Sequence, residues 1–158
     1  MKGRVIAMLL ALALLLSSCG ANRPEQGAPG QYSLYFRTND TGTVLGREYR
    51  TLPQGEEIEE LVKLLLAGPE DGELVSPFPR GTALNRWRLE GDTVALDLSE
   101  AYGGLSGVDQ TLADACLVLT LCQLDQVERI SLTVEGRPRP FQDHPLERSK
   151  YLLELPEK

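Results

Sequence analysis

Histidine, cysteine and large aromatic side chains are scarce in this chain. Its 158 residues include one histidine, three cysteines, one tryptophan and three phenylalanines. A Ser-His-Asp triad would have to use His144, which lies in a polar segment, so we expect a surface histidine and no such triad. Cys116 and Cys122 lack C-x-x-C spacing and stand too far apart in a predicted helix to form a disulfide. We expect them to be small buried residues, with no metal site and no cofactor.

The chain also lacks the basic excess that nucleic-acid-binding proteins carry. It has 16 Lys and Arg against 23 Asp and Glu, for a net charge of −7. Binding to nucleic acid depends on Lys and Arg that neutralise phosphates, so we expect no nucleic-acid partner. Removal of residues 1–18 would take away Lys2 and Arg4 and make the net charge −9.

Only one long apolar run is present, from Val5 to Leu16, directly after two basic residues. A basic start, a short apolar segment and small residues at its end are typical of a signal peptide, here residues 1–18. The run is too short to span a bilayer, which needs about 20 residues. An ordinary secretory signal peptide and a buried core helix are the alternatives.

The sequence Leu16-Ser17-Ser18-Cys19 resembles a bacterial lipobox, in which the cysteine thiol receives diacylglycerol and the chain is cut before it. The resemblance implies cleavage between Ser18 and Cys19 and lipidation of Cys19. We therefore expect a lipid anchor at the extracytoplasmic face of a bacterial cell membrane.

The remaining chain is long enough for one small domain. Residues 19–31 are rich in Gly, Pro and polar residues and are expected to form a flexible tether. Residues 32–141 show the periodicities of an α+β fold, in which two helices pack on a mixed or antiparallel sheet. Residues 142–158 form a polar tail, in which a short helix from Pro145 is one option. Strands are expected at 32–37, 43–52, 85–89, 93–98 and 127–134, and helices at 56–67 and 109–124.

The predicted helix over 109–124 is apolar on more than one face, so it must be covered on both sides. The chain's own tail, around residues 151–155, is one candidate cover. A partner protein is the other, and it makes Leu117, Val118 and Leu121 candidate partner-binding residues.

The loop at 70–82 contains two prolines and two glycines, and a loop of this length in a small domain is often functional. Its residues Leu74, Phe78 and Arg80, together with Tyr102, are further candidates for contact with a partner.

Asp97 lies on the strand face opposite Leu96 and Leu98, where we expect solvent rather than a catalytic pair with a second carboxylate. We expect no enzyme and no catalytic residue.

Three runs then follow in a distinctive order: LLLAGP from Leu64, LVSPFPRGTAL from Leu74 and VALDLSEAY from Val94. Together they resemble the GerMN domain of the sporulation and spore germination family, over residues 32–141. The resemblance implies a small α+β fold similar to the ring-building modules of secretion and sporulation machines. It also implies an extracytoplasmic, often lipid-anchored protein without established catalytic residues.

These observations favour a non-catalytic lipoprotein that docks on envelope proteins in sporulation, germination or assembly of the cell envelope. The alternative is a lipoprotein that binds peptidoglycan fragments or small molecules.

Overall fold

The computed structural model describes residues 30–40, 44–53, 55–140 and 144–151. The predicted signal peptide, Cys19 and nearly all of the tether lie outside these residues. Within the described ranges, no helix is both long and apolar enough to cross a membrane.

The described residues form two separate β-sheets. The first has the strand order β2-β1-β3, with β1 (Gln31–Thr38), β2 (Leu45–Thr51) and β3 (Leu74–Val75). The second has the order β4-β5-β6-β7, with β8 also paired to β6. Its strands are β4 (Leu84–Glu90), β5 (Thr93–Leu98), β6 (Arg129–Val134), β7 (Arg137–Pro138) and β8 (Leu146–Glu147).

The part of the chain that the structure describes also contains three α-helices and one short 3-10 helix: α2 (Glu57–Ala67), α3 (Glu100–Gly103), α4 (Gly107–Leu121) and η1 (Arg148–Lys150). Strand β5 runs parallel to β6, because α3 and α4 carry the chain back across the sheet between them. The other strand pairs are antiparallel.

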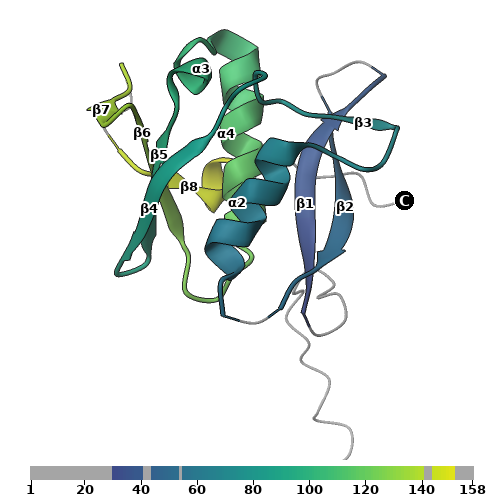
Figure 1. Cartoon of the computed structure of the whole chain (residues 1–158), viewed down its shortest axis with the longest axis horizontal. Coiled ribbons are helices and arrows are strands. Elements are labelled where there is room, and N and C mark those ends of the chain that lie inside the picture. The colour runs from purple at the N-terminus through teal and green to yellow at the C-terminus, as the bar shows by residue number, and fades with distance from the viewer. Residues whose placement is uncertain (1–29, 41–43, 54, 141–143, 152–158) are drawn as a thin grey trace, which may run out of the picture.

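Figure 1 shows α2 and α4 between the two sheets, with β1 and β2 on one side and β4, β5 and β6 on the other. The α+β class is therefore confirmed. The single sheet of the prediction is replaced by two sheets that enclose the main helices, so each sheet turns its other face outward.

Helix α2 follows its sequence pattern closely. Ile58, Leu61, Val62 and Leu65 are buried on one face. Gly68 ends the helix with φ of 94°, a conformation that suits glycine, and its N–H donates to the carbonyls of the last turn.

From Leu112 onward, helix α4 is covered on every side by the domain itself. All ten residues from Leu112 to Leu121 are buried, and the helix contacts β1, α2, β6, β8 and η1. Leu117, Val118 and Leu121 have no exposed surface. Their prediction as partner-binding residues is therefore wrong, because two sheets and the tail enclose the helix.

The end of helix α4 and the turn that follows it also take the place of a strand beside β1. The Tyr35 N–H donates to Oγ1 of Thr120 at 3.1 Å, and the Ser33 N–H donates to Oε1 of Gln123 at 2.9 Å. The Gln123 amide donates to the Ser33 carbonyl at 2.8 Å. These bonds satisfy an edge of β1 that β3 does not reach, which blunts that edge for other strands.

The tail differs from the prediction. A helix from Pro145 is absent from the described residues 144–151, where β8 pairs with β6 and η1 follows. Leu146 is buried and Tyr151 packs against the core. The folded domain therefore extends beyond residue 141, to at least Tyr151.

Candidate functional site

The predicted contact residues of the 70–82 loop and Tyr102 separate into buried and exposed members. Tyr102 is 1% exposed and Phe78 is 7% exposed, and their rings stack with centroids 6.3 Å apart. Leu74 is half-buried in β3, whereas Arg80 is exposed. Phe78 thus packs the loop against the core, and Arg80 is the only one of these four residues that is exposed.

Tyr102 belongs to a buried polar network with Asp114 of α4 and Arg139, just beyond β7. Its hydroxyl donates to Oδ1 of Asp114 at 2.5 Å. The Arg139 guanidinium donates to both oxygens of Asp114 at 2.9 Å and lies over the Tyr102 ring. Burial, and next the nearby Asp114 charge, raise the pKa of Tyr102 well above its usual range. A phenol so firmly protonated is a permanent donor, so the network joins α3, α4 and the β7 segment.

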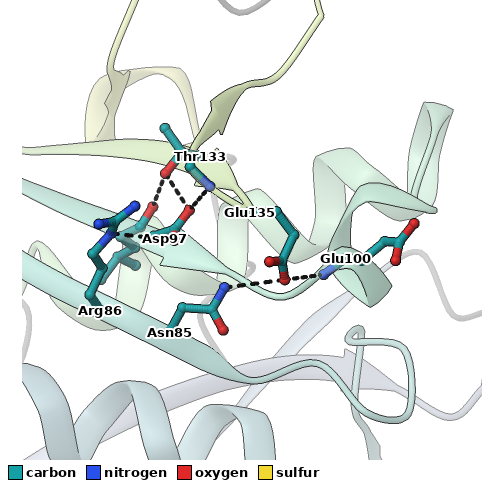
Figure 2. Close-up of polar contacts among 8 residues, drawn as sticks. Asn85, Arg86, Asp97, Glu100, Thr133 and Glu135 are labelled. Atoms are coloured by element: carbon teal, nitrogen blue, oxygen red, sulfur yellow. Dashed lines mark hydrogen bonds and ion pairs between the residues drawn. The ribbon is translucent and has the colours of Figure 1, made fainter.

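Asp97 is the centre of a second polar cluster, at the ends of the parallel strands β5 and β6 (Figure 2). It accepts hydrogen bonds from Oγ1 of Thr133 at 2.7 Å and from the Gly136 N–H at 2.6 Å. The Arg86 guanidinium lies 3.4 Å away. Asp97 is only 7% exposed, so the expectation that it is solvated is wrong.

Glu135 holds the turn between β6 and β7. It has a positive φ of 50° and Gly136 follows with φ of 73°, which is the pattern of a two-residue hairpin turn. Its Oε1 accepts from the Asn85 amide at 3.3 Å and from the Glu100 N–H at 3.1 Å (Figure 2). The carboxylates of Asp97 and Glu135 thus both hold the β6–β7 hairpin in place, Asp97 by accepting from the Gly136 N–H and Glu135 by accepting from β4 and α3.

This arrangement suits a structural role for the acids better than proton transfer. Burial would raise the pKa of Asp97, but the hydrogen bonds from Thr133 and Gly136 and the Arg86 charge outweigh it and hold the pKa below its usual value. A general acid needs the opposite shift, towards neutral pH. Within the described residues, no three His, Cys, Asp or Glu side chains gather in a way that could hold a metal ion.

Two exposed apolar side chains mark a surface that sequence reasoning missed. Val75 and Val108 are 45% and 64% exposed. Both lie near the end of β1, where Val75 pairs with Arg37 and the Arg37 side chain pairs with Asp109, the neighbour of Val108, at 3.0 Å. Val44 is also 46% exposed, but it lies beside Thr38, whose side chain points to the other face of β1. We call Val75 and Val108 the valine patch.

The signal for the valine patch was weak in the sequence. Val75 follows Leu74 on a two-residue strand, so alternation turns one side chain inward and the other outward. A strand of two residues gives no periodicity to reveal this.

A cavity of about 430 Å³ lies where the end of α4 meets β6, β8 and η1. Its lining residues are Cys122, Val127, Glu128, Arg129, Glu147, Arg148 and Ser149. Arg129 is already held by Asp92, with Nη2 2.5 and 2.7 Å from the two carboxylate oxygens. Nε of Arg148 is buried and has no hydrogen-bond partner. Nη1 of Arg148 donates to the Cys122 carbonyl at 3.3 Å, so the guanidinium is held in the wall of the cavity.

Comparison with known proteins identifies the family. The model of the Germane family, described as sporulation and spore germination, matches residues 33–140. No curated protein matches the chain.

Two solved structures share the fold. The tandem GerMN domains of the sporulation protein GerM from Bacillus subtilis align with a TM-score of 0.60 and 19% identity, over 84% of this chain and 48% of that one. The first GerMN domain of the same protein aligns with a TM-score of 0.60 and 17% identity, over 75% of this chain and 94% of that one. The chain thus spans about half the length of the tandem structure.

Proposed function

The chain belongs to the Germane family of sporulation and spore germination proteins, and we propose that it is a lipid-anchored, non-catalytic docking protein of the bacterial envelope. The lipobox-like sequence ending at Cys19 supports an anchor on the extracytoplasmic face of the membrane. Two or three acyl chains are enough for stable attachment, since each buried CH₂ contributes about 0.8 kcal/mol.

The valine patch is the observation that carries the docking role. Its side chains are apolar and exposed, outside the hydrophobic core of the domain. Exposed apolar residues that gather at one place are typical of protein contacts. The buried carboxylates, in contrast, are occupied by internal hydrogen bonds, which supports a non-catalytic role. The domain would dock on an envelope protein during sporulation or germination.

The anchor is tested by Cys19→Ala, with the chain followed in membrane and soluble fractions. We expect the wild-type chain in the membrane fraction and the variant outside it, because the lipid has no other acceptor. A variant that still sediments with membrane would remove the anchor from the proposal and leave the docking role to its own test.

The docking role is tested by Val75→Asp with Val108→Asp, in cells that are sporulating. Cross-linking followed by capture of the anchored chain should recover at least tenfold less of its envelope partner, because two charges would have to be buried in the contact. Thr51→Asp is the matched control, since it adds a charge at the opposite end of the same sheet, where Thr51 pairs with Gln31. Equal recovery from the patch variant and the control would refute docking through the valine patch.

The cavity beside Arg148 supports the second candidate, a lipoprotein that binds a small molecule or a peptidoglycan fragment. A carboxylate is the group that the Arg148 guanidinium, in the lining of this cavity, could bind. A muramyl dipeptide is a suitable probe, and titration calorimetry should show binding that Arg148→Met abolishes. No heat of binding would leave docking as the function that the surface supports.

A further inference from the structure

We propose that β4 pairs antiparallel with β4 of a second copy of this chain, so that two five-residue segments centred on Arg88 join the second sheets of both molecules. Strand β4 is at the edge of the second sheet, and β5 is its only strand neighbour among the described residues. Five of its seven residues are exposed. An uncovered edge of this length is a template for another strand. The inference is independent of any docking partner.

Hydrogen-bonded and non-bonded pairs alternate along β4 and β5, and this alternation decides which backbone N–H and C=O groups of β4 are not bonded to β5. Glu90 pairs with Thr93 across the two-residue turn at Gly91, whose φ of 62° at the first turn position suits a hairpin. In such a hairpin the closing pair exchanges both hydrogen bonds, and bonded and non-bonded pairs then alternate. The N–H and C=O groups of Trp87 and Leu89 therefore point to the free edge.

A second β4 strand that is centred on Arg88 brings its own outward-facing backbone groups opposite those of the first strand. The register sets Trp87 opposite Leu89 of the other molecule, and these are the residues whose backbone groups face outward. Two Trp87–Leu89 pairs would thus be hydrogen-bonded, whereas the two Arg88 residues would face each other in a non-bonded pair. The bulge that follows Leu84 lies outside the five paired residues.

The side chains are complementary in the same register. On the inner face of the sheet, exposed Leu89 would be covered by Trp87 of the other copy. On the outer face, Arg86 would lie opposite Glu90, and this pair would occur twice. Opposite charges and aromatic–aliphatic contacts across strands each stabilise the pairing, and one Arg88–Arg88 contact opposes it.

Local charge also favours this edge for self-association. The chain as a whole is acidic, with a net charge of −7, so most of its surface repels a second copy. The outer face near β4 is balanced instead, because Arg86 pairs with Asp97 and Arg88 pairs with Glu90 at 2.5 Å. Five paired residues make a small contact, so we expect a weak dimer that a shared membrane would strengthen.

The experiment is disulfide trapping in cells that express the full chain. Arg88→Cys should form a dimer when copper phenanthroline is added, since non-bonded antiparallel pairs have Cα atoms about 4.5 Å apart, within disulfide reach. Arg86→Cys is the matched control: Arg86 and Arg88 side chains are 69% and 65% exposed. In the proposed register the two copies of residue 86 stand about 14 Å apart, so this variant should not cross-link. The native Cys116 and Cys122 are buried and free.

The register is tested by charge reversal in the Arg88→Cys background. Glu90→Lys should lower the dimer yield roughly five- to tenfold, because two opposite-charge pairs become like-charge pairs. Adding Arg86→Glu should restore the yield. The dimer is measured in membrane and soluble fractions alike, so a failed anchor does not obscure the result.

Three results would overturn the proposal. One is equal cross-linking of the residue 86 and residue 88 variants, which indicates random collision. Another is a yield that Glu90→Lys leaves unchanged. The last is a disulfide from position 88 to a different protein, which indicates that another chain occupies this edge.

Discussion

The buried network of Tyr102, Asp114 and Arg139 makes a sharp prediction about stability. Asp114→Asn keeps the shape of the side chain but removes its charge. Arg139, only 9% exposed, would then be left as a buried cation whose two donors have lost their carboxylate. We expect the free energy of unfolding to fall by about 3–5 kcal/mol, the usual cost of removing one partner from a buried ion pair.

Two further substitutions set the scale of this loss. Tyr102→Phe removes a single hydrogen bond to a charged acceptor and leaves both Arg139 bonds in place, so about 1.5–3 kcal/mol is expected. Arg139→Met should cost as much as Asp114→Asn, because it leaves the carboxylate buried with one donor. When Asp114→Asn and Arg139→Met are combined, neither charge remains. The double variant should therefore lose at least about 2 kcal/mol less than the sum of the single losses.

The assay is urea unfolding of a soluble form that begins at Gly20. Trp87 is the only tryptophan in the chain, and its indole N–H donates to Glu59 of α2 at 3.0 Å, so its fluorescence reports the contact between β4 and α2. Single-variant losses below about 1 kcal/mol, or a double variant equal to the sum, would refute the account of the network as a buried, coupled ion pair.

The other predictions concern Asp97 and the two thiols. The pKa of Asp97 is held below its usual value of 3.8, so its contribution is present above that pH and is lost as the pH falls through the folded-state pKa. Asp97→Asn should thus lower stability by about 1.5–3 kcal/mol at pH 7, and the gap to wild type in urea should narrow below about pH 4; a constant gap would contradict the assignment. Burial raises the pKa of Cys122 to about 11 and that of Cys116 still further. Iodoacetamide at pH 8 should therefore label both slowly, Cys122 first because it lines the cavity; mass spectrometry that finds Cys116 labelled first would contradict the structure.

The sequence predicted those elements that carry a long, regular pattern. Helix α2 and the β4–β5 hairpin appear within one or two residues of their expected ends, because an amphipathic stripe and a Gly-containing turn are local signals. Helix α3 has no signal of its own in the sequence, since four residues with a glycine show no periodicity. Strand pairing is a long-range property, so the division into two sheets could not be read from separate strands.

The polar clusters show the same limit at the level of single residues. Alternation correctly set Asp97 on the face opposite Leu96 and Leu98. Its burial depends on Thr133 and Gly136, which lie more than 35 residues away in the chain. Asp114 and Arg139 are likewise 25 residues apart, and nothing local indicates that they form a pair. Residues that bind each other across long stretches of the chain leave no local pattern in the sequence.

The arrangement of layers decides where this domain can meet other proteins. An apolar helix in a small α+β protein is often one face of a contact, and α4 carries the strongest such signal here. Because α2 and α4 lie between two sheets, most of their apolar residues are buried, and much of the surface left for contacts consists of sheet faces and strand edges (Figure 1). Thr120 of α4 and Gln123, just after the helix, bind Tyr35 and Ser33 and close one strand edge, whereas β4 has no second strand neighbour in the described part of the chain. Contacts made by this domain should therefore be disrupted by charges on β3 and β4, and core substitutions in α4 should act only through stability.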